Sequence, residues 1–460
     1  MNQAALTSVS PQNPADLVGR VSASSPDQVR AAVERARAAQ REWAQASPAV
    51  RSAALNAVAD ALAAASDEFA ELIVREVGKP VGEAAGEVLR GVAILRYYAQ
   101  QAFDPDGETY PSDAGTLLMS RSRPHGVAGL ITPWNFPLAI PLWKAAPALA
   151  FGNSVVLKPA EQSPVVAVRL GHLFAERLPA DVVTVVPGDG TAGRALVDTA
   201  DCVSFTGSVA VGEQVRAAAV ARGVPVQCEM GGHNPSIVLA DADPAAAAAT
   251  IAAAAMGYAG QKCTATSRVI VVGDPDEFTQ ALAAAIDNLA VGDPMKPDTV
   301  VGPVISEAAR TAVVDAATRA QDDGGRIVRG GRALDLSGYF VAPTLITGLP
   351  ADHPVNQREV FGPICTVLAA DNDDHAVALA NGVPYGLVGA VFTRDLDRAL
   401  RLVGRLDTGM ARVNAATSGV DFYAPFGGAK ISSYGPREQG KAARAFYTRT
   451  QTVTIAASSR

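Results

Sequence analysis

The first hundred residues show the hydrophobic periodicity of amphipathic helices. After the start signal Ser24-Ser25-Pro26-Asp27, apolar residues recur at intervals of three and four, and similar patterns run through 48–65, 68–77 and 82–102. The pattern breaks at 104–107, and the alternating segment 115–124 predicts a hairpin or an extended arm. The first part of the chain is therefore expected to be helical, with one extended excursion.

From Gly126 the pattern changes to short β-branched runs separated by helical stretches. Segments 126–131, 154–159, 181–188, 201–208 and 224–232 each predict a strand, and a second such series follows between 235 and 414. This alternation is typical of parallel strands joined by crossover helices, so the sequence predicts a doubly wound α/β fold. Segment 450–458 alternates like an edge strand, and an exposed edge favours pairing with another chain.

Composition narrows the class of protein. With 460 residues, of which 48% are hydrophobic, the chain is long enough for two or three domains. The net charge of −7, with no basic cluster, argues against a nucleic-acid partner. No secretion signal or long uncharged apolar stretch is visible, so we expect a cytoplasmic protein without a membrane partner. The four cysteines are widely spaced, which predicts neither a disulfide framework nor a metal site.

Cys263 is the candidate nucleophile. It lies in GQKCTATSR, between a helix expected to end at Gly260 and a strand expected from Arg268. A thiol in such a loop can be exposed, and its thiolate is an effective nucleophile. Taken alone, a cysteine of this kind is more often a small core residue. The other three cysteines lie inside apolar strand-like runs and are interpreted as packing residues: Cys202, Cys228 and Cys365.

Glu229 and Asn135 are candidate partners of this thiol. Glu229 ends a predicted strand, where an α/β sheet places its chemistry, and burial would raise its pKa and suit it to general-base work. Asn135 lies in the stiff loop TPWNFP, where its amide can donate to a developing oxyanion. The alternatives are a carboxylate bonded to a loop amide and a turn-forming asparagine.

A third group of residues suggests a nucleotide site. Gly207 and Ser208 open a helix that carries Gly212, and the free N–H groups of a helix start suit a pyrophosphate. Lys158 and Glu161 follow another strand and would suit ribose hydroxyls, although a solvated charge pair is the alternative.

Glu359 and Phe361 lie in a tight turn before a further strand. They would suit a second ribose and a flat ring, the alternative being a surface carboxylate and a core aromatic residue.

These segments occur in a recognisable order. The strings TPWNFP, LKPAEQSP, FTGS, EMGGHNP, GQKCTATSR, REVFGP and PFGG resemble the signature segments of the aldehyde dehydrogenase superfamily, non-acylating and NAD(P)-dependent. The resemblance runs from about Asn13 to the C-terminus, and no strand is expected before Asn13.

The resemblance implies a mechanism. Cys263 would attack the aldehyde, and the oxyanion of the thiohemiacetal would be held by the Asn135 amide and the Cys263 backbone N–H. Hydride transfer to NAD or NADP would leave a thioester, which Glu229 would direct to water. The cofactor contacts would be Lys158 and Glu161 at the adenosine ribose, Trp134 and Ser208 at the phosphates, and Glu359 and Phe361 at the nicotinamide.

The resemblance also implies an architecture. Segments 1–106 and 124–231 would form a Rossmann-like cofactor-binding domain, and 232–425 an α/β catalytic domain containing Cys263. Segments 107–123 and 446–460 would form a small β oligomerisation arm, and the chain would assemble as a homodimer or homotetramer.

The substrate is less constrained. The string TSGVDFYAPFGGAKISSYGPREQG is most similar to the ketoglutarate semialdehyde (2,5-dioxopentanoate) dehydrogenase branch. Ala429 and Lys262 stand where arginine is usual, and lysine does not reproduce the bidentate arginine fork that suits a carboxylate. An aliphatic or aromatic aldehyde therefore stays open. The candidate substrate-binding residues are Phe136, Trp143, Lys262, Phe422 and Tyr423.

Three rival functions can be weighed against the same residues. A CoA-acylating dehydrogenase or a glutamyl-phosphate reductase does not call for a base such as Glu229. A catalytically silent structural homologue does not need Cys263, Glu229 and Asn135 together. Glu161 leaves the choice between NAD and NADP open.

Overall fold

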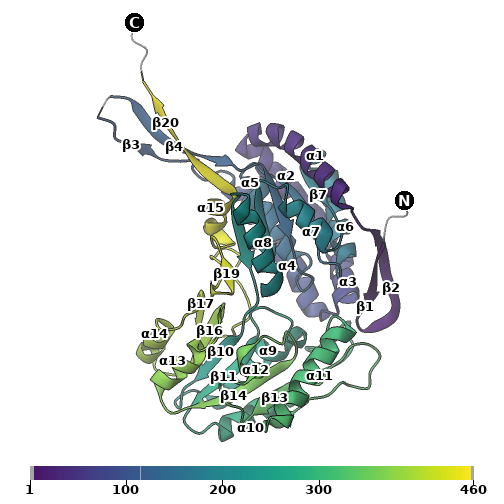
Figure 1. Cartoon of the computed structure of the whole chain (residues 1–460), viewed down its shortest axis with the longest axis vertical. Helices are drawn as coiled ribbons and strands as arrows, with labels where there is room; N and C mark the ends of the chain where they lie inside the picture. The colour runs from purple at the N-terminus through teal and green to yellow at the C-terminus, as the bar shows by residue number, and fades with distance from the viewer. Residues whose placement is uncertain (1–4, 114, 457–460) are drawn as a thin grey trace.

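The computed structural model describes residues 5–113 and 115–456 and contains two α/β sheets and a projecting three-stranded sheet (Figure 1). The predicted α/β class is confirmed. The six strands of the first sheet run in the order β19-β9-β8-β5-β6-β7. They are β5 (Val127–Ile131), β6 (Ser154–Lys158), β7 (Val183–Val185), β8 (Cys202–Thr206), β9 (Val226–Glu229) and β19 (Ser433–Tyr434).

The first sheet is parallel except for β19, which runs antiparallel to β9. Strands β6 and β7 lie on one side of the central pair β5 and β8, and β9 and β19 lie on the other, so the strand order reverses direction at this pair. The switch point of such a sheet lies at the carboxyl ends of the central strands, where α/β folds bind their ligands.

Nine helices of the described residues accompany this sheet, and the four N-terminal ones begin and end within two residues of their predicted bounds. The first, from Pro26, starts with a capping box between Ser25 and Gln28. The helices are α1 (Pro26–Gln45), α2 (Pro48–Ala64), α3 (Ser66–Val77), α4 (Val81–Gln101), α5 (Ala139–Ala150), α6 (Pro164–Arg177), α7 (Gly190–Val197), α8 (Val209–Ala221) and α15 (Ala443–Tyr447).

The seven strands of the second sheet run in the order β12-β13-β14-β11-β10-β16-β17, parallel except for β12. They are β10 (Asn234–Val238), β11 (Thr266–Val272), β12 (Arg326–Arg329), β13 (Thr344–Thr347), β14 (Ile364–Ala370), β16 (Val388–Phe392) and β17 (Met410–Val413). The helices of this unit are α9 (Pro244–Met256), α10 (Asp276–Asp287), α11 (Glu307–Asp322), α12 (Pro354–Gln357), α13 (Asp373–Asn381) and α14 (Leu396–Val403).

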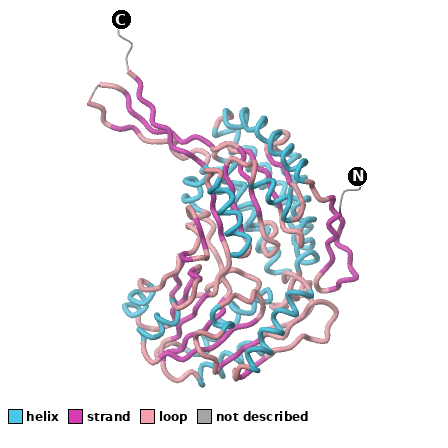
Figure 2. The backbone as a smooth tube through the Cα atoms, viewed as in Figure 1, coloured by secondary structure: helices cyan, strands magenta, loops and turns pink. Residues whose placement is uncertain are grey.

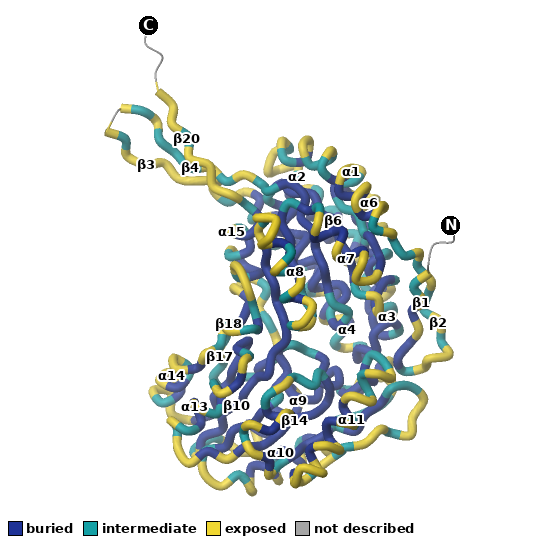
Figure 3. Tube along the Cα trace, viewed as in Figure 1, coloured by how far each residue is buried: buried dark blue, intermediate teal, exposed yellow. Residues whose placement is uncertain are grey.

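The projecting sheet consists of β3 (Thr109–Tyr110), β4 (Leu117–Pro124) and β20 (Thr448–Ile455), in the order β20-β4-β3. It leaves the body of the molecule as a narrow, largely exposed ribbon (Figures 2 and 3). The predicted extended arm and the predicted final strand are thus confirmed as one structure. Residues 114 and 457–460, which the sequence places in this arm, lie outside the described residues.

One strand differs from the prediction: β1 (Ala5–Ser10) pairs with β2 (Asn13–Ser22) as an antiparallel hairpin. The expectation of no strand before Asn13 is therefore wrong. The segment ALTSVS alternates over only six residues and contains small polar side chains, so its pattern is weak until β2 pairs with it.

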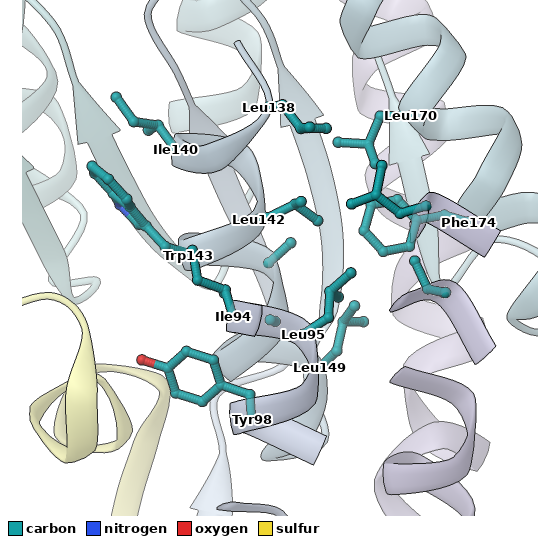
Figure 4. Packing of buried hydrophobic residues seen from close by; sticks show 14 of the residues in the cluster. Ile94, Leu95, Tyr98, Leu138, Ile140, Leu142, Trp143, Leu149, Leu170 and Phe174 are labelled. Carbon is teal, nitrogen blue, oxygen red and sulfur yellow. The ribbon is translucent and has the colours of Figure 1, made fainter. Parts of the chain in front are cut away.

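The hydrophobic core beside the first sheet is built around α5, in which every residue is buried. Figure 4 shows buried side chains of this core, including Leu95 of α4 and Leu142 of α5. Helix α4 packs closely against α5, because a Cβ atom on Gly91 would come 2.7 Å from Leu142 Cδ1. The same helix caps α5, since the Glu87 carboxylate accepts hydrogen bonds from the backbone N–H groups of Leu138 (3.0 Å) and Ala139 (2.9 Å). Helix α4 thereby fixes the loop that precedes α5, which contains Asn135.

None of the described helices is both long and apolar enough to cross a membrane.

The packing of α4 on α5 predicts the effect of a core truncation. Leu142→Ala removes a fully buried side chain at this contact and should lower the free energy of unfolding by about 2–5 kcal/mol. Leu89→Ala, on the exposed side of α4, is the matched control and should change it by less than about 0.5 kcal/mol. Thermal or urea unfolding followed by circular dichroism measures both, and equal shifts for the two variants would contradict the packing assignment.

Candidate active site

The candidate residues meet between the two sheets. Lys158 and Glu229 are the last residues of β6 and β9, and Asn135 lies in the loop after β5, all at the carboxyl edge of the first sheet. Cys263 and Phe361 each lie three residues before the amino end of a strand of the second sheet, β11 and β14. The carboxyl edge of one sheet therefore faces the amino edge of the other across the site.

The loop that carries Cys263 follows a tight turn. Helix α9 ends at Met256, four residues before the predicted end, and Gly257–Gly260 form a 3-10 turn. Tyr258 and Ala259 have left-handed φ values of 54° and 52° within this turn. Gly260 is also left-handed, and a Cβ atom there would come 2.1 Å from the Gly362 carbonyl oxygen, so only glycine fits.

Two asparagines hold the backbone of this loop. Asn234 Nδ2 donates to the carbonyl oxygens of Cys263 and Ala265, both at 2.8 Å. Asn135 Nδ2 donates to the Gln261 carbonyl oxygen at 2.9 Å, two residues before the thiol. Since an amide nitrogen carries two hydrogens, one N–H of Asn135 is left over by this bond.

Cys263 is a free cysteine that is partly exposed as a residue, whereas Cys202, Cys228 and Cys365 are buried, as expected for packing residues. Burial raises the pKa of the Cys263 thiol well above its usual range, and the nearby carboxyl groups of Glu359 and Glu229 raise this pKa further. The resting thiol is therefore protonated at neutral pH, and a proton acceptor is needed to activate it.

Glu229 is only 2% exposed, and its environment favours the neutral acid. Burial raises the pKa of Glu229 well above its usual value, with a further contribution from the charge of Glu438. Ser433 Oγ donates to Glu229 Oε2 at 2.6 Å and opposes this rise. Behind it, Glu438 pairs with the buried Lys144 and accepts a hydrogen bond from Trp143 Nε1 at 2.6 Å. A carboxyl group with a raised pKa beside a thiol suits proton transfer.

Several predicted cofactor residues have unsatisfied polar groups that fit a dinucleotide. The Lys158 amine is largely buried and makes no side-chain hydrogen bond to the described residues. Burial lowers its pKa, while Glu161 and Asp189 raise it. Ser208 is the exposed N-cap of α8, and its hydroxyl makes no capping bond. A cation and the free N–H groups at a helix start match the charge of a pyrophosphate.

On the other side of the site, aromatic rings and a carboxylate lie together. The rings of Trp134 and Phe361 pack edge to face at 5.7 Å. Glu359 Oε1 accepts a hydrogen bond from the Gly232 N–H at 3.2 Å, and burial raises the pKa of Glu359 to about 7. Glycine at position 231 leaves room for the Glu359 carboxylate, because a Cβ atom there would come 1.9 Å from Glu359 Oε2. The residues present fit a nicotinamide dinucleotide.

Two predicted cofactor glycines face the sheet. A Cβ atom on Gly207 would meet the Phe205 ring at 2.6 Å, and one on Gly212 would meet Met230 Sδ at 2.4 Å. Packing of α8 on the sheet is therefore sufficient to explain both glycines, and contact with a cofactor stays a prediction for each.

A cavity of about 320 Å³ joins the candidate nucleophile and base. It is lined by Cys263 and Glu229 together with three of the predicted substrate residues, Phe136, Trp143 and Lys262. The other two, Phe422 and Tyr423, line a separate surface groove with Leu89.

Arg90 also lines this cavity, and the sequence did not identify it. In the sequence, Arg90 is one polar residue of a predicted amphipathic helix. That pattern does not indicate which part of the fold the residue faces.

Comparisons with known proteins agree with this geometry. The sequence model described as aldehyde dehydrogenase family matches residues 1–453. The chain is 40% identical to the alpha-ketoglutaric semialdehyde dehydrogenase of Bacillus subtilis (strain 168), covering 96% of this chain and 94% of that one. It is also 40% identical to the alpha-ketoglutarate semialdehyde dehydrogenase of Haloferax volcanii, with coverage of 96% and 94%.

Solved structures are similar over nearly the whole chain. A putative aldehyde dehydrogenase from Burkholderia cenocepacia superposes with a TM-score of 0.95 at 36% identity, covering 98% of this chain and 94% of that one. The betaine aldehyde dehydrogenase of Staphylococcus aureus, solved in complex with NAD+, superposes with a TM-score of 0.95 at 31% identity and coverage of 98% and 91%. The chain belongs to the aldehyde dehydrogenase family. It is an NAD(P)-dependent oxidoreductase acting on aldehydes through the cysteine chemistry of that family.

The exposure of the four thiols predicts selective alkylation. In the native reduced protein, iodoacetamide should modify Cys263 alone, and the rate should keep rising above pH 8.5 because the thiol pKa is raised. Mass spectrometry of tryptic peptides measures the sites. Cys263→Ser is the control and should take up label only after denaturation. Equal native labelling of that variant would contradict the assigned accessibility.

Proposed function

We propose that this enzyme oxidises a semialdehyde with a distal carboxylate, 2,5-dioxopentanoate being the leading candidate, to the carboxylic acid. The observation that carries the proposal is the single cavity that joins Cys263 to Glu229. The names of the relatives in Bacillus subtilis and Haloferax volcanii support the substrate class. Phe136 and Trp143 in the same lining favour, as a second candidate, an aliphatic or aromatic aldehyde.

In the first half of the reaction, Cys263 Sγ attacks the carbonyl carbon and its proton passes to Glu229. The new oxyanion is held by the remaining N–H of Asn135 and the Cys263 backbone N–H. An oxidised nicotinamide held by Glu359 and Phe361 would supply the hydride acceptor for the substrate carbon, and loss of the hydride would leave a thioester on Cys263.

Before the second half, Glu229 releases the thiol proton to solvent. The ionised carboxylate then takes a proton from water, and the resulting hydroxide attacks the thioester carbon. The carbon–sulfur bond breaks, the acid leaves, and Glu229 returns its proton to the thiolate so that the thiol is restored. Because the pKa of Glu229 is raised, the ionised base becomes available only as the pH rises, so deacylation should accelerate with pH through that pKa.

The cofactor assignments are supported by polar groups at the carboxyl edge of the first sheet and at the facing amino edge of the second sheet. Lys158 and Glu161 hold the adenosine ribose, Ser208 and Trp134 the phosphates, and Glu359 and Phe361 the nicotinamide end. Glu161 is exposed, so it can turn toward or away from a 2′ substituent, and the cofactor is NAD or NADP.

The domain roles are part of the same proposal. Residues 1–106 and 124–231 bind the cofactor, 232–425 supply the nucleophile, and the arm of 107–123 and 446–460 joins subunits into a homodimer or homotetramer. Strand β20 supports this, because it pairs with β4 on one side and is an edge strand on the other. Free thiols at all four cysteines suit a reducing, cytoplasmic location.

The assigned base predicts a trapped intermediate. Glu229→Gln should slow hydrolysis by roughly 100-fold or more. Acylation also slows, because the Cys263 proton then passes to solvent and not to Glu229, but above neutral pH it stays faster than hydrolysis, so that the acyl group accumulates on the Cys263 peptide. Intact-protein and peptide mass spectrometry after an acid quench measures the adduct. Wild-type turnover without an adduct in this variant would remove Glu229 from its role.

The substrate class predicts an order of kcat/KM values. With NAD and NADP tested separately, 2,5-dioxopentanoate should exceed pentanal and benzaldehyde by at least about 10-fold, as expected when a charged group meets a matched partner. Initial rates of NAD(P)H formation measure this order. A preference for the neutral aldehydes would favour the second candidate.

A further inference from the structure

The cavity beside Cys263 is lined by charged side chains that differ in their partners. Glu83, Glu87 and Arg90 come from α4, and Lys262 comes from the nucleophile loop. Glu83 Oε1 accepts a hydrogen bond from Lys262 Nζ at 2.8 Å, which makes a neutral pair. Lys262, which the sequence suggested for substrate binding, is thereby already engaged.

Glu87 is engaged as well. Its side chain pairs with the fully buried Lys79 and accepts the two backbone hydrogen bonds that cap α5. Lys79 in turn lies over the Phe136 ring, 3.7 Å from its centroid. Both charges of this pair are therefore matched, although Glu87 lines the cavity.

Arg90 has no such partner. Within residues 5–113 and 115–456 it makes no salt bridge and no side-chain hydrogen bond, although it is only partly exposed. By contrast, Arg96 on the same helix pairs with Asp60 at 3.2 Å. Glu229 also lines the cavity, but burial raises its pKa and favours the neutral acid. After Glu229 and the pairs Glu83–Lys262 and Glu87–Lys79 are set aside, Arg90 is a cation of the lining without an ionic partner among the described residues.

The space next to Arg90 on α4 is open. Gly86, one turn earlier on the helix, also lines the cavity, and a Cβ atom there would meet nothing within 4 Å. A planar guanidinium beside open, partly desolvated space can form two parallel hydrogen bonds to a carboxylate. The chain thus has an arginine fork in the lining of this cavity.

We propose that Arg90 binds the distal carboxylate of the substrate while the aldehyde carbon lies at Cys263, and that it determines the preference for semialdehydes. The inference rests on the proposed function and names the residue that carries it. A neutral aldehyde of the same length leaves the guanidinium without this partner.

The test compares 2,5-dioxopentanoate with pentanal, which has the same number of carbon atoms and no carboxylate. The quantity measured is the ratio of the two kcat/KM values. In Arg90→Met this ratio should fall by roughly 10- to 100-fold, mainly through KM of the semialdehyde, because a charge-assisted bidentate contact is lost. Arg90→Lys should restore part of the ratio, since the charge remains without the fork.

Arg96→Met is the matched control, because it removes a positive charge from the same helix outside the cavity. It should keep the wild-type ratio, which separates a specific contact from a general change in electrostatic steering. Inhibition by glutarate, which has carboxylates but no aldehyde, gives an independent readout, and its inhibition constant should rise in Arg90→Met alone.

The outcomes distinguish this inference from the proposed function. If the wild-type enzyme prefers 2,5-dioxopentanoate and Arg90→Met keeps both that preference and the glutarate constant, Arg90 is excluded while the substrate class stands. If the wild-type enzyme shows no preference for the carboxylate, the substrate class itself fails and the role of Arg90 fails with it.

Discussion

The hydrogen bonds from Asn234 to the carbonyl oxygens of Cys263 and Ala265 are the constraint on which the site depends. They fix the nucleophile loop to the first residue of β10, and Asn234 Oδ1 accepts a further bond from the Val388 N–H at 3.2 Å. Removing this buried amide would leave carbonyl oxygens without donors, which costs more than a surface hydrogen bond. The thiol is therefore fixed relative to the second sheet, and the hydrogen bond from Asn135 to the Gln261 carbonyl oxygen connects the same loop to the first sheet, which carries Glu229.

Burial and like charge set the protonation of this site. Glu229 and Glu359 lie close enough to Cys263 to raise its pKa, and both carboxyl groups have raised pKa values themselves because burial disfavours their charged forms. A protonated thiol is protected from adventitious oxidation, and a carboxyl group near its own pKa can accept and return a proton. The same low-polarity surroundings thus keep the thiol protonated and raise the pKa of Glu229, so that the ionised Glu229 carboxylate is a stronger base than an exposed one.

Local signals in the sequence were sufficient for much of the fold and for the central residues. The helices from Pro26 to Gln101 follow from periodicity and caps, and the strand ends at Lys158, Thr206 and Glu229 follow from β-branched runs that stop abruptly. Long-range pairing was not visible: β1 becomes a strand only through β2.

The same limit applies to the substrate cavity. Arg90 is one polar residue on an amphipathic helix until α4 is packed beside the Cys263 loop. The sequence suggested Lys262 for substrate binding, but in the fold its amine pairs with the Glu83 carboxylate. Phe422 and Tyr423 follow closely in sequence after residues that line the cavity, but their side chains line a separate groove. Gly207 and Gly212 resembled a phosphate loop, and packing against Phe205 and Met230 explains them as well.

The claim that Cys263 carries the acyl group is tested most directly by comparing Cys263→Ser with Cys365→Ser, the latter replacing a buried cysteine of β14. The quantity measured is aldehyde-dependent NAD(P)H formation, with binding of the reduced cofactor followed by fluorescence to show that the fold is intact. We predict that Cys263→Ser binds the cofactor and loses turnover by at least roughly 1,000-fold, while Cys365→Ser keeps most of its activity. Undiminished turnover in Cys263→Ser would contradict the account.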